Sequence, residues 1–64
     1  MPMIHVEMFA GRTADQKREL VREMTDTYVR VLGGRAESVS IILTDVEQSD
    51  WAKGGVFYAD RDKG

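Results

Sequence analysis

The sequence predicts an α+β fold: one short β-α-β unit with parallel strands and a C-terminal hairpin, in a sheet that is completed by oligomerisation. Two stretches, residues 3–9 and 37–45, alternate between the two faces of an extended chain, which is the period of a strand. The stretch between them places apolar residues at spacings of three and four, which indicates one amphipathic helix. A strand, a helix and a strand in this order form the smallest unit with two parallel strands.

The first predicted strand spans Met3 to Phe9, in the segment MIHVEMF. One face carries three apolar side chains, and the other carries Met3 and Phe9 beside two polar groups. Because apolar residues stand on both faces, we expect partial burial on both sides of the strand. Ala10-Gly11-Arg12 then interrupts the alternation and ends the strand.

The helix is predicted to begin after Thr13, which has the spacing of a capping box with Gln16. Its apolar stripe is expected to face the core and consists of Leu20, Val21, Met24, Tyr28, Val31 and Leu32. Gly33-Gly34 ends the helix, because glycine adopts left-handed backbone angles at low cost.

The second predicted strand spans Glu37 to Asp45, in the segment ESVSIILTD, with alternate apolar residues on one face. The remaining segment, Glu47 to Gly64, contains Trp51, the pair Gly54-Gly55 and a short apolar run. This pattern predicts a small hairpin.

The small size of the chain predicts an oligomer. A chain of 64 residues forms at most one domain, here residues 1–64, and buries only about 60% of the surface that its unfolded form exposes. With no cysteine and one histidine, disulfides and a structural zinc site are not expected. Two parallel strands also leave unpaired edges and an uncovered face, which we expect another subunit to cover.

Composition excludes several classes of partner. A net charge of -2 and the absence of a basic patch argue against a nucleic-acid partner. The sequence shows no secretory signal and no run of about 20 apolar residues. We therefore expect a cytoplasmic location and no membrane association. No phosphate loop, metal motif or nucleotide fingerprint is present, so neither a metal nor a cofactor is expected.

Pro2 is the only proline of the chain. If Met1 is removed, Pro2 carries a free secondary amine. Terminal amines have pKa values of about 7.7–8.0, and burial lowers such a pKa because the charged form loses hydration. The amine would then be a neutral base at physiological pH. The alternative interpretation is a proline that merely begins an edge strand, where a missing N–H costs nothing.

Arg12 follows the first strand, and its guanidinium group could hold a substrate carboxylate. The alternative is a solvated loop arginine. The strand between Pro2 and Arg12 spans roughly 23 Å at about 3.3 Å per residue. If both residues serve one site, they must therefore come from different subunits. Trp51 could supply an apolar wall of that site, or simply anchor a core or an interface.

Several segments together resemble the 4-oxalocrotonate tautomerase family: the N-terminal Met-Pro, EMFAGRTADQKRELV, ESVSIILTD and the aromatic residue in DWAKGG. The resemblance covers nearly the whole chain and implies a tautomerase-like domain without Met1 and a homohexamer, built as a trimer of dimers. It implies Pro2 as general base and Arg12 as the group that binds a substrate carboxylate. It also implies that Trp51, at a position that is usually phenylalanine, keeps the site dry.

Ser40 departs from the family pattern. It matches the position of a second arginine, which binds part of the substrate in the tautomerases of dicarboxylates. Serine offers a hydrogen bond but no charge, so we expect Ser40 in the substrate-binding site and a preference for monoacids such as phenylenolpyruvate. Arg35, Lys53 and Arg61 are candidates for a compensating cation.

The resemblance therefore implies a cofactor-independent keto-enol tautomerase, an isomerase that converts a small 2-hydroxydienoate or enol acid into its 2-oxo-enoate. Two alternatives stay open. One is a hydratase or dehalogenase of unsaturated acids, in which a protonated Pro2 acts as an acid. The other is a non-catalytic oligomeric protein of the same fold.

Overall fold

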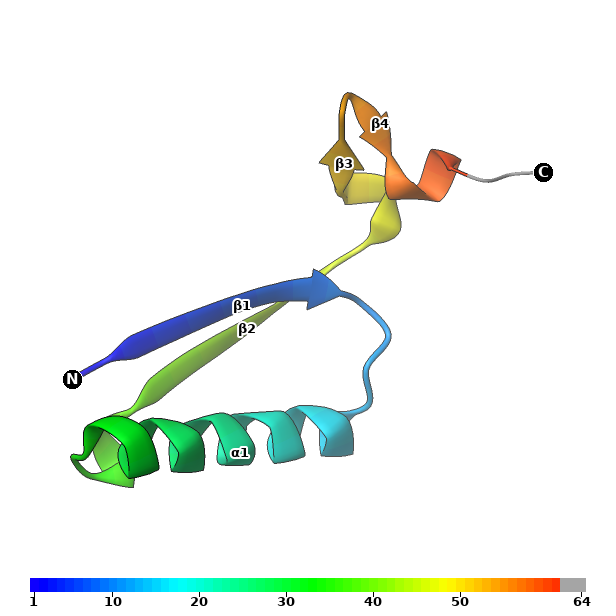
Figure 1. Ribbon diagram of the computed structural model, residues 1–64. Helices are drawn as coiled ribbons and strands as arrows, with labels where there is room; N and C mark the ends of the chain where they lie inside the picture. Colours follow the sequence, from blue (N-terminus) through cyan, green and yellow to red (C-terminus); the bar gives the residue numbers. More distant parts are fainter. Residues whose placement is uncertain (62–64) are drawn as a thin grey trace.

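The computed structural model describes residues 1–61 and shows a β-α-β unit followed by a C-terminal hairpin (Figure 1). Strands β1 (Met3–Phe9) and β2 (Ser40–Val46) pair in parallel along their whole length, with Met3 opposite Ser40. Helix α1 (Ala14–Leu32) connects them and lies along one face of this two-stranded sheet. The predicted fold class is therefore confirmed.

Helix α1 begins and ends where the sequence predicts. The Thr13 hydroxyl accepts a 3.0 Å hydrogen bond from the Gln16 backbone N–H, and the Gln16 side-chain oxygen accepts a 2.9 Å bond from the Thr13 N–H, which completes the capping box. At the other end, the Gly33 N–H donates to the Val29 carbonyl at 2.8 Å. Within residues 1–61 no helix has the length and apolar character needed to cross a membrane.

The second strand begins later than predicted. We expected it to start at Glu37, but Ala36–Ser38 form a short 3-10 helix, η1, and β2 runs from Ser40 to Val46. The backbone N–H groups of Ser38 and Val39 donate to the Arg35 and Ala36 carbonyls at 2.9 and 3.1 Å. These local bonds replace the ladder bonds of a strand over the first residues of the predicted segment.

The hairpin consists of β3 (Ala52–Lys53) and β4 (Val56–Phe57), which pair antiparallel. Gly54 and Gly55 form its turn with φ angles of +64° and +85°, as a tight hairpin turn requires. Short 3-10 helices, η2 (Gln48–Asp50) and η3 (Tyr58–Asp60), flank it. The predicted segment extends to Gly64, but its residues 62–64 lie outside the described residues.

The interior is thin, and none of the residues 1–61 is fully buried. The apolar stripe of α1 is only partly covered: Val21, Met24 and Tyr28 are half-buried, whereas Val31 and Leu32 remain 63% and 69% exposed. The expectation that these last two face a core is thus wrong for the isolated chain, because a sheet of two strands is too narrow to cover the whole helix.

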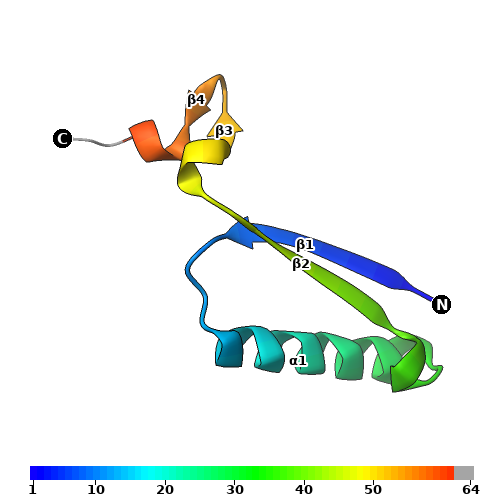
Figure 2. The ribbon, with the colours of Figure 1, turned by 180° about the vertical axis from the view of Figure 1, so that it is seen from behind.

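The shape of the chain is extended rather than globular. Its radius of gyration is 15.4 Å, whereas a compact domain of this length would have about 11 Å. The hairpin projects beyond the β-α-β unit, as the view from behind also shows (Figure 2). Large apolar side chains remain exposed on both parts, including Met3 at 59%, Ile42 at 49% and Phe57 at 44%. The sheet is not closed within one chain.

Candidate functional site

Pro2 lies directly before β1 and is half-buried. Its carbonyl accepts a 3.0 Å hydrogen bond from the Ser40 backbone N–H. Pro2 lines a cavity of about 290 Å³ between the end of α1 and the start of β2, together with Met1, Tyr28, Gly33, Gly34, Arg35, Ser38 and Val39. The candidate base therefore shares a cavity with one cation of its own chain.

The loop after α1 forms one wall of the Pro2 cavity. Gly33 and Gly34 have φ angles of +83° and +94°, in the region that residues with a side chain rarely adopt. This backbone reverses the direction of the chain after the helix and leads into Arg35 at the edge of the cavity.

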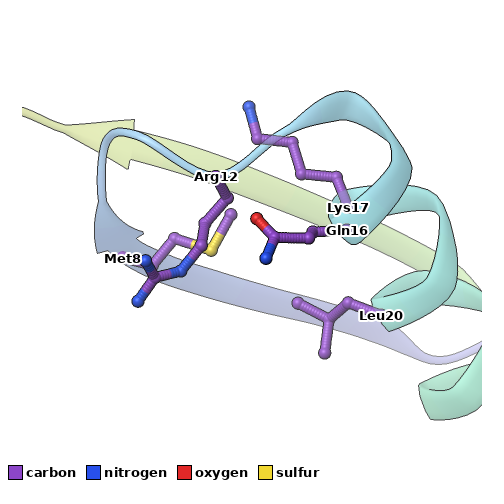
Figure 3. A pocket seen from close by; sticks show the side chains of 5 residues that line it. All are labelled: Met8, Arg12, Gln16, Lys17 and Leu20. Carbon is purple, nitrogen blue, oxygen red and sulfur yellow. The ribbon is translucent and has the colours of Figure 1, made fainter.

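Arg12 lies in the loop between β1 and α1 and lines a different cavity, of about 230 Å³, with Met8, Gln16, Lys17 and Leu20 (Figure 3). Met8 and Leu20 give this cavity an apolar wall. The second cation there, Lys17, forms an ion pair with Asp45 of β2. Figure 3 shows the Lys17 amine directed away from the Arg12 guanidinium. Within residues 1–61 Arg12 forms no ion pair.

One chain does not bring Pro2 and Arg12 together. Pro2 precedes β1 and Arg12 follows it, so the seven-residue strand separates them by roughly 23 Å. The two residues also line separate cavities.

Trp51 lies at the Arg12 end of the sheet, in an aromatic cluster with Phe9 and Tyr58. Its ring centroid lies 4.6 Å from that of Phe9 and 6.2 Å from that of Tyr58. Trp51 lines a third cavity, of about 290 Å³, with Glu7, Val46, Asp50 and Ala52. The cluster fixes the base of the hairpin against the end of β1, far from Pro2 of the same chain.

Comparison with known proteins identifies the family. A family model described as tautomerase enzyme matches residues 2–61, which is nearly the whole chain. The chain belongs to the tautomerase family. The resemblance inferred from the sequence is thereby confirmed, and an isomerase activity is supported at the level of the family.

The relatives of this tautomerase have similar lengths. It is 32% identical to a "Probable tautomerase" of Lactiplantibacillus plantarum, with 97% of each chain covered. It is 35% identical to a "Probable tautomerase" of Listeria monocytogenes, with 94% of this chain and 98% of the relative covered.

Solved structures of 4-oxalocrotonate tautomerase homologues have the same fold. One shares 40% identity at a TM-score of 0.86, covering 97% of this chain and 98% of that one. TomN, a homologue in the tomaymycin biosynthetic pathway, shares 28% identity at a TM-score of 0.88, covering 94% and 92%. A heterohexameric 4-oxalocrotonate tautomerase from Chloroflexus aurantiacus shares 26% identity at 0.86, covering 95% and 98%.

The structure separates the three candidate cations for the position matched by Ser40. Arg35 lines the Pro2 cavity of the tautomerase chain. Lys53 and Arg61 lie in the C-terminal part. The Arg61 guanidinium there donates to the carbonyls of Lys53 and Val56, and lies 4.8 Å from the Tyr58 ring centroid. Ser40 is the first residue of β2, directly beside Pro2.

Three features of these sites were missed from the sequence. Tyr28 was interpreted as core but lines the Pro2 cavity, and Gln16 lines the Arg12 cavity. Asp45 was given no role in the sequence prediction but pairs with Lys17, with 39% and 33% of the side chains exposed. The sheet register contains the missing signal, because Asp45 lies opposite Met8, on the face that α1 covers. Within residues 1–61 no cluster of metal-ligating side chains is present.

Proposed function

We propose that this tautomerase is a cofactor-independent isomerase that converts a small 2-hydroxydienoate or related enol acid into its 2-oxo-enoate. The observation that carries the proposal is the half-buried Pro2, in a cavity that it shares with the cation of Arg35. The proposed active form lacks Met1 and begins with the secondary amine of Pro2.

The Pro2 amine acts as the general base in this proposal. Partial burial of Pro2 lowers the pKa of the amine, because the charged form loses hydration. The neutral nitrogen takes the proton of the enol hydroxyl and returns it to a carbon of the conjugated chain. One O–H bond is broken, one C–H bond forms, and the double bonds shift, so no redox partner is needed and the amine is regenerated.

Arg12 binds the substrate carboxylate. Its guanidinium group offers parallel N–H donors that match the two carboxylate oxygens. Beside it, Met8 and Leu20 provide an apolar surface for the hydrocarbon part of the substrate. The positive charge also stabilises the electron density that develops along the conjugated system during proton transfer.

The proposed site is formed between subunits. Because Pro2 and Arg12 of one chain lie at opposite ends of β1, a single substrate reaches both only if Arg12 comes from a neighbouring chain. The open sheet and the exposed apolar side chains supply the surfaces for that contact. We propose a homohexamer, a trimer of dimers, in which Trp51 of a hairpin excludes water from the amine and Ser40 lies beside the substrate.

Activity towards phenylenolpyruvate tests this proposal. Pro2→Ala replaces the secondary amine by a primary amine without the geometry that the proline ring fixes, and it should lower kcat/KM by at least about 100-fold. Arg18→Gln is a matched control, because Arg18 is 74% exposed on α1 and lines none of the three cavities, and it should leave kcat/KM unchanged. Full activity of Pro2→Ala would refute the role of Pro2 as the base, whereas no turnover of any enol acid by the wild-type protein would favour a non-catalytic protein of the same fold.

The pH dependence of the same reaction distinguishes a base from an acid. A basic Pro2 predicts activity that rises with pH through a pKa below about 8. A protonated Pro2, as in a hydratase or dehalogenase, predicts loss of activity over that range. The partial burial of Pro2 favours the first outcome.

A further inference from the structure

Arg35 is the cation of the Pro2 cavity, and it is weakly engaged by its own chain. Its nearest carboxylate is that of Glu37, with 4.0 Å between Nε of Arg35 and Oε1 of Glu37. Both side chains are largely exposed, at 80% and 77%. Such surface pairs contribute little. Most donors of the Arg35 guanidinium are therefore available to a ligand in the cavity.

The chemistry of the cavity matches an anionic group. A guanidinium carries five N–H donors in a planar fork and stays charged at all physiological pH values. Tyr28 and Ser38, which line the same cavity, add two neutral hydroxyl donors. These residues come from the last turns of α1, the loop after it and η1, and line the cavity together with Pro2.

We infer that Arg35 is a substrate-selecting residue of the Pro2 site and that it binds a second carboxylate, at the end of the substrate opposite the one held by Arg12. The inference rests on the proposed function, because it assumes that the substrate reacts at Pro2. It reverses the preference for monoacids that Ser40 alone suggests. Arg35 supplies the second positive charge from the loop after α1, whereas the second arginine of the family pattern lies in β2, at the position of Ser40.

A matched pair of enol acids tests this inference. The two substrates share one conjugated chain and differ only in whether its far end carries a carboxylate. The wild-type protein should prefer the dicarboxylate. Arg35→Gln should lower kcat/KM for the dicarboxylate by about 10- to 100-fold, the worth of a hydrogen bond between charged groups, mainly through KM. The same substitution should change kcat/KM for the monoacid by less than about 2-fold.

Two further variants separate this role from a general loss of positive charge. Arg35→Lys keeps the charge but not the fork and should give an intermediate kcat/KM for the dicarboxylate. Arg30→Gln removes another exposed arginine from the same end of α1, outside the Pro2 cavity. It should leave kcat/KM unchanged for both substrates. An equal loss for both substrates in Arg35→Gln, or no loss for either, would overturn the inference.

Failure of the proposed function gives a different result. If the wild-type protein turns over neither acid, or Pro2→Ala keeps full activity, the role of Pro2 is wrong. Binding of adipate and hexanoate, measured by calorimetry, then tests Arg35 alone. Tighter binding of adipate that Arg35→Gln abolishes supports the inference, and equal binding of the two acids overturns it.

Discussion

The backbone N–H of Ser40 donates a 3.0 Å hydrogen bond to the carbonyl of Pro2. This bond continues the parallel pairing of β1 and β2 by one step beyond Met3 and Ser40. It holds Pro2 at the start of β2 through its carbonyl oxygen alone, and a proline within a chain has no N–H to offer the sheet. The anchoring of Pro2 therefore leaves its nitrogen out of the ladder, as the proposed chemistry requires.

The capping box of α1 predicts a measurable effect on stability. Thr13→Ala removes the hydroxyl that accepts the Gln16 N–H and should lower the free energy of unfolding by about 1 kcal/mol. Thr13→Ser keeps the acceptor and should unfold as the wild type does. Urea unfolding at one fixed protomer concentration measures both, because assembly and folding are coupled. A Thr13→Ala protein as stable as the wild type would show that the box contributes nothing.

The ion pair between Lys17 and Asp45 ties α1 to β2 and is only about one-third exposed on each side, at 33% and 39%. Asp45→Asn should lower the free energy of unfolding by about 0.5–1 kcal/mol at low salt, and less at high salt. The control is Glu23→Gln, which breaks a pair with Arg22 in the middle of α1, with side chains 64% and 63% exposed. We expect almost no change in the free energy of unfolding of the control. Equal effects of the two variants would show that the pair between Lys17 and Asp45 does not stabilise the packing of α1 on β2.

A site shared between chains predicts complementation of inactive subunits. Pro2→Ala and Arg12→Gln should each be nearly inactive alone. When the two variants are denatured, mixed and refolded together at equal amounts, about a quarter of sites combine an intact Pro2 of one chain with an intact Arg12 of another. Activity should recover to that level. No recovery in mixed oligomers would place both residues of the site on one chain.

Trp51 predicts a linked change in stability and pH dependence. Its contact with Phe9, at 4.6 Å between ring centroids, should contribute about 0.5–1.5 kcal/mol beyond burial. Trp51→Ala should lose this contribution to the free energy of unfolding. It should also admit water to the Pro2 amine, which raises the pKa of the amine and moves the rise in activity to higher pH. Trp51→Phe keeps an aromatic wall and should retain the pH profile. An unchanged profile in Trp51→Ala would remove Trp51 from the site.

Local signals in the sequence predicted the elements well. The bounds of β1 follow from its alternation, and the start of α1 follows from Thr13 and Gln16, because both patterns depend only on neighbouring residues. The predicted start of β2 was wrong because the formation of η1 depends on how the chain returns from the helix after Gly34. The exposure of Val31 and Leu32 was also missed, since a sequence pattern does not show how wide the sheet is.

The candidate site was predicted less completely than the fold. The opposite placement of Pro2 and Arg12 follows from the length of the strand between them. The sequence alone does not predict that Arg35 lines the same cavity as Pro2. That placement depends on the positive φ angles of Gly33 and Gly34 and on the register of β2. The same non-local packing brings Tyr28 to the Pro2 cavity.

The nitrogen of Pro2 is the centre of this account, and the chain contains only one proline. Labelling with ¹⁵N-proline therefore gives a single NMR signal whose chemical shift can be followed as a function of pH. The account predicts an amine signal that titrates with a pKa below about 8 and coincides with the rise in kcat/KM. An amide signal that does not titrate, or an amine whose pKa lies above that range, would contradict it.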